Sequence, residues 1–343
     1  MSTPTPTAVV GASGFAGVEL VRMVLQHPRL QLSAVAAKGS AGQRVDQSWP
    51  QLSGLPVGEM QIEAVDAKAL AAKAEIVLLA LPHGVSAPIA AQLLKEGVQV
   101  VDMGADFRLP DAAQWEEVYG SPHAEPQLLG AAVNGLVELN RAALPGAQLI
   151  AAPGCYPTAT TLAAAPAVRH LGVDWVISDC MSGVSGAGRK LSATTHYCAV
   201  NESVSAYAMG GVHRHSVEME RLLAPARVSF TPHLVPMTRG LLATVHMRPS
   251  QLPTQAQVTA LYREFYADSP MVVWRDGPPG TDSVRGSARA HLHACVDQKR
   301  GVLSVSCAID NLLKGAGAQG IQALNVARGW PETMGLPLFP VLP

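Results

Sequence analysis

A single thiol, Cys155, stands in a Pro/Gly-rich stretch of the chain, Ala152-Pro-Gly-Cys-Tyr-Pro-Thr158. A cysteine that serves only core packing is rarely found in such a stretch, because chain of this composition lies near the surface. The residues that follow predict a helix over 158–170, which would begin close to Pro157. Its dipole and free amide groups would favour a thiolate at Cys155. These residues therefore predict a nucleophile.

An imidazole and a carboxylate occur together further along the chain. His213 and His215 are two residues apart, so they would point to different sides of a helix, and nothing else completes a metal site. If a helix begins near His215, Glu218 shares its face and can orient and charge the imidazole. This pair suits general acid–base catalysis. A surface ion pair is the alternative.

Three arginines, Arg108, Arg189 and Arg239, follow predicted strands or glycine-rich turns. The planar guanidinium suits a carboxylate or a phosphate, so each is a candidate substrate-binding residue. An ion pair with Asp106 or Asp111 is the alternative for Arg108. The Gly/Ser-rich stretch before Arg189 could hold an anion through its amides, or it could be a solvent-exposed hinge.

The first half of the chain contains elements that could position a nucleotide. A short apolar run at 8–10 leads into Gly11-Ala-Ser-Gly-Phe-Ala-Gly17 and then a predicted helix over 18–26. Strand, glycine turn and helix in this order bring backbone amides close to a pyrophosphate. The GxxGxxG spacing differs slightly from the usual fingerprint, and a simple tight turn is the alternative. The candidate cofactor-binding residues here are Gly11, Ser13, Gly14, Phe15, Ala16 and Gly17.

The second predicted strand, over 30–37, ends in Lys38-Gly-Ser40 without an acidic residue. An NAD-specific fold usually places a carboxylate at this tip, whereas a 2′-phosphate requires cations and hydroxyls. Lys38 and Ser40 therefore favour NADP(H), and ordinary loop residues are the alternative.

Further strands are predicted at 75–81, 98–103 and 147–151, and His83 follows the first of them. Their alternation with helices predicts a parallel sheet with ligands at its carboxyl edge. In the second half, the predicted strands suggest a mainly antiparallel sheet, and a glycine-rich helix after residue 310 could return to cover the first domain. The strands of this half are expected at 175–181, 228–235, 241–248, 271–275, 288–296 and 301–309. The region 111–146 is expected to be rich in loops.

The composition agrees with a two-domain globular protein that acts on small molecules. The chain has 343 residues, 48% of them hydrophobic, and a formal net charge of -1. No basic run indicates nucleic-acid binding, and no long apolar run indicates a membrane segment or a signal peptide. The five scattered cysteines predict neither a disulfide framework nor a zinc site, so we expect a reducing cytoplasm.

Taken together, these stretches resemble the N-acetyl-γ-glutamyl-phosphate reductases of the aspartate-semialdehyde dehydrogenase-like superfamily. Ala152 stands where that family usually has Asn. The matching segments, in family order, are Gly11–Gly17, Leu81-Pro-His83, Ala105-Asp-Phe-Arg108, Pro153–Thr158, Ser185-Gly-Ala-Gly-Arg189, His213-Arg-His215, Pro232-His233 with Arg239-Gly240, and Asp310-Asn-Leu-Leu-Lys-Gly315.

The resemblance implies an α/β protein with a Rossmann-type NADP-binding domain, residues 1–154 with 313–343, and an α+β catalytic and oligomerisation domain, residues 155–312. It implies that Cys155 attacks the acyl phosphate, that NADPH reduces the thioester in arginine biosynthesis, and that His215, oriented by Glu218, is the acid/base, with His213 as second choice. A homodimer or homotetramer is expected. Further implied cofactor-binding residues are His83, Ser185, Gly186, Gly188 and Asn311.

Two other functions fit the same residues. One is a sister reductase that acts on aspartyl phosphate or on a carrier-bound aminoadipyl phosphate. The other is a non-catalytic NADP-binding regulator that retains the fold, and the presence of the cysteine, histidine and arginines argues against it.

Overall fold

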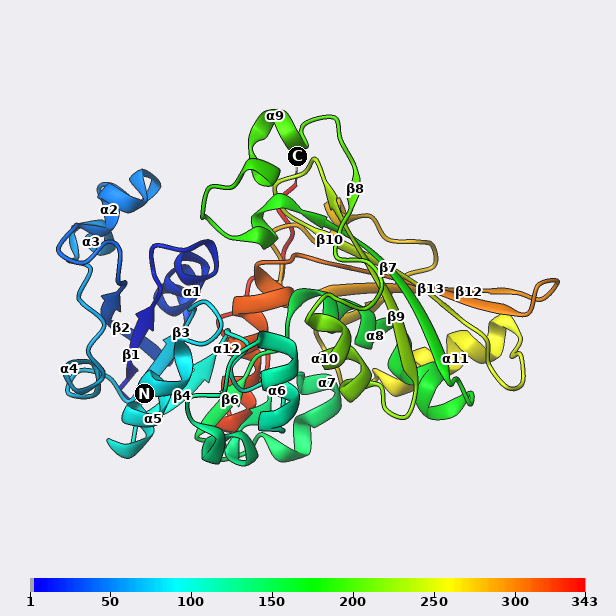
Figure 1. Cartoon of the computed structure of the whole chain (residues 1–343), viewed down its shortest axis with the longest axis horizontal. Coiled ribbons are helices and arrows are strands. Elements are labelled where there is room, and N and C mark those ends of the chain that lie inside the picture. Colours follow the sequence, from blue (N-terminus) through cyan, green and yellow to red (C-terminus); the bar gives the residue numbers. More distant parts are fainter. Residues whose placement is uncertain (1–2, 343) are drawn as a thin grey trace. The chain divides into compact units, whose positions relative to one another are not determined.

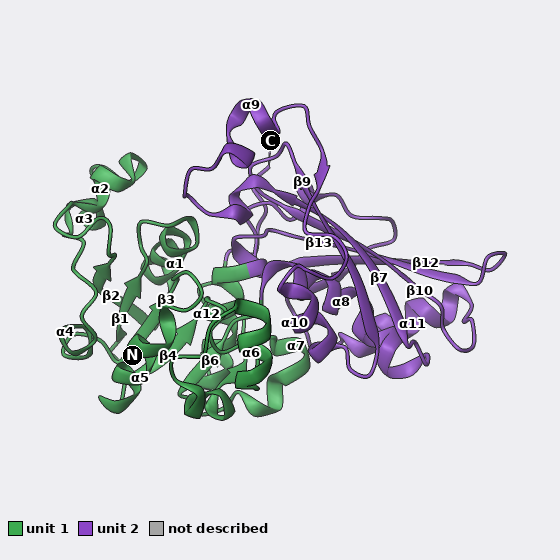
Figure 2. Ribbon diagram, in the orientation of Figure 1, with its two compact units in different colours: residues 1–153, 316–336 green, residues 154–315, 337–343 purple. Residues whose placement is uncertain are grey.

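The computed structural model describes residues 3–342, which form two compact units (Figures 1 and 2). Of these residues, the first unit comprises 3–153 with 316–336, and the second 154–315 with 337–342. The expected division placed 313–343 entirely in the first domain. The end of the chain belongs instead to the second unit, because Ala288 N donates to Pro337 O and Val341 N donates to Arg285 O, each at 2.7 Å.

The first unit is built on a parallel sheet. Within the described residues it has six strands in the order β2-β1-β3-β4-β6-β5, and every neighbouring pair is parallel. All residues of β3 and β4 are buried, as expected for apolar runs in a sheet covered on both faces. The strands are β1 (Thr5–Val10), β2 (Leu30–Ala36), β3 (Ile76–Leu79), β4 (Gln99–Asp102), β5 (Val133–Asn134) and β6 (Leu149–Ala151).

Helices connect these strands, and the order of elements is that of a Rossmann-type fold. The last helix, α12 (Ala318–Ala327), returns from the far end of the chain, where Gln319 Nε2 donates to Gly135 O at 2.7 Å. The region expected to be rich in loops contains α6 (Ala112–Tyr119), capped by Asp111, whose carboxylate accepts from Ala113 N. The other helices of this unit are α1 (Phe15–Gln26), α2 (Val45–Ser48), α3 (Pro56–Glu59), α4 (Ala67–Ala71), α5 (Ser86–Lys95) and α7 (Val137–Asn140).

The second unit is built on a mixed sheet. In the described part of the chain this sheet has seven strands in the order β11-β12-β13-β10-β7-β9-β8. Four neighbouring pairs are antiparallel, while β11–β12 and β7–β9 are parallel, so the predicted mainly antiparallel sheet is confirmed. The strands are β7 (Trp175–Gly183), β8 (Ser205–Ala206), β9 (Arg227–Val235), β10 (Leu241–Met247), β11 (Val272–Trp274), β12 (Ala290–Asp297) and β13 (Val302–Ile309).

The buried helix α8 (Cys155–His170) lies at the centre of this unit, with β10, β13 and α10 (His215–Leu222) among its neighbours. Pro166 lies inside α8 and has no N–H for the carbonyl of Leu162. Tyr266, which ends α11 (Gln255–Phe265), supplies the missing donor, because its hydroxyl donates to Leu162 O at 2.6 Å. Tyr262 of α11 donates to the next carbonyl, Ala163 O, at 2.6 Å. A tertiary contact thus repairs the interrupted helix.

Two further findings complete the fold. The short helix α9 (Tyr197–Val200) lies in an exposed excursion between β7 and β8. Among residues 3–342, no helix is both long enough and apolar enough to cross a membrane.

Candidate active site

The glycine turn of the first unit allows very close backbone approach. Gly11 has φ +87°, and a Cβ there would lie 2.2 Å from Ala80 O, while a Cβ at Gly17 would lie 2.1 Å from Gly11 O. Gly14 is the N-cap of α1, and within the described chain no side chain caps this helix end. The first-turn amides of α1 therefore suit a bound anion, and the turn fits the pyrophosphate of a dinucleotide.

The tip of β2 carries Lys38, which is exposed, and Ser40, which is half-buried. The backbone of Glu63 pairs with that of Ala36 at this tip, a contact that the sequence did not predict. Lys73 Nζ lies 2.9 and 2.8 Å from the two carboxylate oxygens of Glu63. The acidic group beside the strand tip is therefore already neutralised by an ion pair.

Cys155 is the first residue of α8, three residues earlier than the predicted start of this helix. Gly154 is the N-cap in extended conformation, and Thr158 N and Thr158 Oγ1 both donate to Gly154 O at 2.9 Å. The thiol is half-buried. It thus lies at the positive end of a 16-residue helix, a position that stabilises a thiolate.

Glu218 holds the chain immediately before the cysteine. This buried residue of α10 accepts a hydrogen bond from Gly154 N at 3.0 Å through Oε1. The helix starts at His215, the condition on which the proposed pairing depended, so His215 and Glu218 are in its first turn. The spacing of residues near Glu218 predicted His215 as its partner. It could not predict the contact with Gly154, which is 64 residues away in the sequence.

His213 and His215 are brought together, with ring centroids 4.8 Å apart. His213 Nδ1 accepts the backbone N–H of His215 at 3.1 Å, so this nitrogen carries no proton. Burial, aided by the neighbouring Arg214 charge, lowers the pKa of His213 to about 4. His213 is consequently a neutral residue that holds the start of α10.

Two tyrosines, Tyr156 and Tyr207, lie beside the two histidines, and the sequence analysis did not predict either of them. The Tyr156 ring lies 5.7 Å from that of His213 and 5.9 Å from that of His215. Its hydroxyl lies 2.8 Å from the Tyr207 hydroxyl. Burial raises the pKa of both phenols. Tyr156 follows Cys155 directly, and this adjacency was the signal in the sequence that could have found it.

The three predicted arginines are divided between the two units. Arg108 belongs to the first unit and is buried; its Nε donates to Ala152 O at 2.9 Å and its Nη2 to Met103 O at 2.8 Å. Arg189 belongs to the second unit and is exposed. Ala152, which stands where an Asn was expected, is held through its backbone, because its amide also donates to Asp102 O at 2.8 Å.

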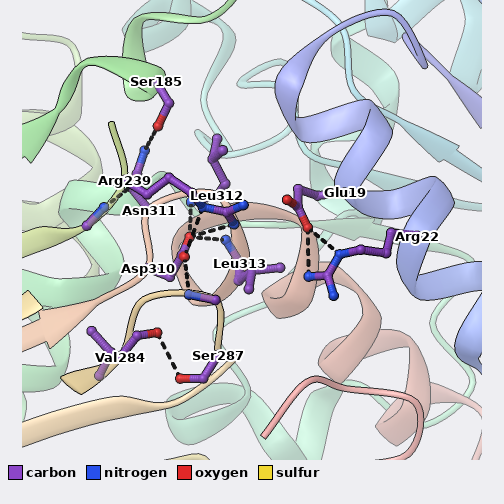
Figure 3. A network of polar contacts seen from close by, with 12 residues as sticks. Glu19, Arg22, Ser185, Arg239, Val284, Ser287, Asp310, Asn311, Leu312 and Leu313 are labelled. Carbon is purple, nitrogen blue, oxygen red and sulfur yellow. Dashed lines mark hydrogen bonds and ion pairs between the residues drawn. The ribbon is translucent and has the colours of Figure 1, made fainter. Parts of the chain in front are cut away.

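Arg239 binds a carboxylate of the same unit. Its Nε and Nη2 each lie 3.1 Å from an oxygen of Asp310, as Figure 3 shows. Asp310 is fully buried and was not among the predicted site residues. It directly follows β13, and a carboxylate after a buried strand was the available signal.

The remaining predicted cofactor residues are divided between the units. Asn311 Nδ2 donates to Ser185 Oγ at 3.0 Å, and Asn311 Oδ1 accepts from Gly240 N at 2.8 Å, so both side chains tie strand ends of the second unit (Figure 3). Gly186 and Gly188 lie beside Ser185 in the same turn, and both are exposed. His83 is exposed in the first unit, with its ring 5.3 Å from that of Tyr119.

The fold defines the class of protein. Residues 6–147 match the family model described as semialdehyde dehydrogenase, NAD binding domain, and residues 155–311 match semialdehyde dehydrogenase, dimerisation domain. Aspartate semialdehyde dehydrogenase II from Vibrio cholerae has a similar structure, with a TM-score of 0.72 at 15% identity over 95% of this chain and 98% of that one. The enzyme from Candida albicans, solved with NADP, gives a TM-score of 0.68 at 16% identity, covering 94% and 98%. This chain is thus an oxidoreductase with a nicotinamide-dinucleotide-binding domain.

Full-length relatives identify the family within this class. The chain is 44% identical to an N-acetyl-gamma-glutamyl-phosphate reductase from Geobacter sulfurreducens, over 98% of this chain and 99% of that protein. It is also 44% identical to the reductase of this name from Halorhodospira halophila, over 96% of each. The chain belongs to the N-acetyl-gamma-glutamyl-phosphate reductase family, which confirms the resemblance found in the sequence.

Proposed function

We propose that this protein reduces N-acetyl-γ-glutamyl phosphate to N-acetylglutamate 5-semialdehyde with NADPH, in arginine biosynthesis. The observation that carries the proposal is the position of Cys155 at the first residue of a long buried helix, with Gly154 held by Glu218 and His215 opening the neighbouring helix. Membership of the family supports the substrate. A thiol at this position suits a reaction that passes through an acyl group on sulfur.

In the proposed mechanism, His215 takes the proton of Cys155. The thiolate, favoured by the amino end of α8, attacks the acyl carbon, and inorganic phosphate leaves. NADPH, its pyrophosphate held by Gly11–Gly17, would supply the hydride that reduces the acyl carbon on sulfur. The Cys155 thiolate then departs from the aldehyde and recovers its proton from His215. The aldehyde carries the added hydrogen, and the enzyme returns to its starting state.

The assignment of this role to His215 rests on the contrast with its neighbour. His213 uses Nδ1 as an acceptor for a backbone amide, and its lowered pKa makes it a poor proton donor near neutral pH. His215, at the start of α10, is the proposed acid/base. Glu218 is proposed to support both groups, because it binds the amide before Cys155 and belongs to the same helical turn as His215.

The proposed preference for NADPH over NADH rests on the tip of β2. Lys38 and Ser40 lie after this strand, and Glu63, whose backbone pairs with the strand end, is bound by Lys73. Such a tip accommodates a 2′-phosphate better than a free ribose 2′-hydroxyl. Gly11–Gly17 would hold the pyrophosphate. Arg189 is exposed and follows an amide-rich turn, so we propose it as a substrate-binding residue.

We further propose that two copies associate through the open face of the second sheet. On β7, Trp175, Ile177 and Met181 are 47, 44 and 42% exposed, although they lie in the middle of a wide sheet. The alternate residues Val176 and Cys180 are fully buried, and Cys180 Sγ lies 3.5 Å from Thr160 Oγ1 of α8. An apolar row of this kind on a domain whose family model is a dimerisation domain fits a second copy of the chain.

Analytical ultracentrifugation tests this association. We expect a dimer or tetramer at micromolar concentration and a smaller species for Ile177→Asp. Gln92→Asp, on the exposed side of a first-unit helix, is the matched control and should leave the mass unchanged. A monomeric unmodified protein would contradict the proposal.

The five cysteines, which form no disulfide in the described chain, fit the proposed reducing cytoplasm.

Substrate choice tests the proposed reaction. With N-acetylglutamate semialdehyde, inorganic phosphate and NADP, we expect NADPH formation that depends on phosphate. Activity with aspartate semialdehyde alone would favour a sister reductase. Binding of NADP without turnover of either aldehyde would favour a non-catalytic regulator.

A further inference from the structure

We propose that Asp310, with Arg239 as its charge partner, is a positioning residue for the thiol of Cys155, and that it acts through Gly315. The proposal rests on the proposed role of Cys155 as the nucleophile. All four residues belong to the second unit. It assigns Arg239 a role different from the substrate clamp that its sequence position predicted.

The first observation is a close approach of backbone to the cysteine. A Cβ at Gly315 would lie 2.7 Å from the Cβ and 3.2 Å from the Cα of Cys155. Real Cβ atoms essentially never approach to that distance, so a side chain at 315 would displace Cys155 or move the chain that carries Gly315. Gly315 is not among the glycines with positive φ, so this space alone requires a glycine. The backbone at 315 thus forms one wall against the nucleophile.

The second observation is the turn that places this wall. Residues Leu313–Gly317 form a π-helical turn, in which Gly315 N donates to Asp310 O at 3.0 Å. Such five-residue turns are rare and occur frequently at functional sites. Leu313 N donates to the same carbonyl at 3.2 Å. The backbone of Asp310 is therefore the anchor from which the position of Gly315 is set.

The third observation is how firmly Asp310 is held. Its carboxylate accepts from Leu312 N at 2.9 Å and Leu313 N at 3.2 Å, at the start of the turn, and from Gly286 N at 2.7 Å, in a distant segment. The two nitrogens of Arg239 complete this set, which Figure 3 displays. A buried carboxylate is stable only when it is paired and hydrogen-bonded in this way. Arg239 therefore fixes Asp310, Asp310 fixes the turn, and the turn fixes Gly315 against Cys155.

Two variants test the proposal, and alkylation of the thiol is the readout. The rate of Cys155 alkylation by iodoacetamide, followed by mass spectrometry from pH 5 to pH 10, needs no substrate. For Gly315→Ala we expect the pH midpoint to rise toward the value of roughly 8.5 for a free cysteine, and kcat to fall at least about tenfold. Gly277→Ala, where a Cβ would meet nothing within 4 Å, is the matched control and should change neither.

Arg239→Lys separates positioning from substrate binding, and it also serves if Gly315→Ala fails to fold. It keeps the charge but loses the fork that binds both oxygens of Asp310. Positioning predicts a lower kcat, an unchanged KM for the acyl phosphate and a shifted alkylation midpoint. A raised KM with a normal alkylation profile would show a substrate clamp and overturn the proposal. If Cys155→Ser is inactive while Gly315→Ala and Arg239→Lys are alkylated normally, only the positioning role is refuted. An active Cys155→Ser would refute the proposed function itself.

Discussion

The carboxyl group of Asp102 provides a test of the electrostatics of the first unit. This residue ends β4 and is fully buried, and its Oδ1 accepts from Gly104 N at 2.8 Å. Burial, and to a smaller extent the nearby Asp106 carboxylate, raises the pKa of Asp102 from 3.8 to about 7. Asp102→Asn removes the titration and keeps an oxygen that can accept the Gly104 amide.

The sign of the effect follows from proton binding. Between pH 4 and pH 7 the folded protein holds a proton on Asp102 that the unfolded chain has released, so folding stability from this group falls as pH rises and levels off above pH 7. Each pH unit in that window corresponds to about 1.4 kcal/mol of unfolding free energy. The unfolding free energy of Asp102→Asn, minus that of the unmodified protein, should therefore rise by on the order of 3 kcal/mol from pH 5 to pH 8.

Urea unfolding of both proteins at pH 5, 6, 7 and 8 measures this difference. Groups that titrate identically in the two proteins cancel, so the pH dependence of the difference belongs to Asp102. A difference that stays constant over this range would refute the raised pKa. If the unmodified protein became more stable than the variant as pH rises, the pKa of Asp102 would be lowered by folding and not raised.

Two further predictions concern the helix α8 and the glycine turn. Tyr266→Phe leaves the carbonyl of Leu162 without its donor and should cost about 1–3 kcal/mol of unfolding free energy. Combining it with Pro166→Ala, which restores a helical N–H for that carbonyl, should recover much of the loss, and additive losses in urea unfolding would argue against this account. Gly17→Ala places a Cβ 2.1 Å from Gly11 O and should weaken NADPH binding at least about tenfold by fluorescence titration, whereas unchanged affinity would separate this turn from the cofactor.

Elements whose residue pattern is local were predictable from the sequence. The strand predicted at 8–10 and the helix predicted at 18–26 lie within β1 and α1, because the apolar run and the glycine spacing lie within one short segment. The start of α8 was placed too late, since Pro-Gly-Cys-Tyr-Pro is typical of a loop although Pro157 fits a first helical turn. The helix α11 was missed, yet Thr254 and Gln257 form a capping box that could have revealed it.

Partners distant in the sequence were beyond such reasoning. Glu218 binds Gly154, 64 residues away, and Arg239 binds Asp310, 71 residues away. From sequence spacing, Glu218 could be paired only with the nearby His215, and Arg239 could be assigned only to a substrate. The residue types at the candidate site were thus predictable, whereas the contacts that hold them are set by the sheet and helices of the second unit.

In the proposed mechanism, catalysis passes through a covalent bond to Cys155. The most direct measurement compares kcat of Cys155→Ser with that of the unmodified protein in phosphate-dependent NADP reduction, with NADPH affinity measured in parallel. We expect a loss of kcat of at least about a thousandfold with nearly unchanged NADPH affinity, because a serine hydroxyl lacks the low pKa of a thiol. A Cys155→Ser protein that keeps most of its turnover would contradict it.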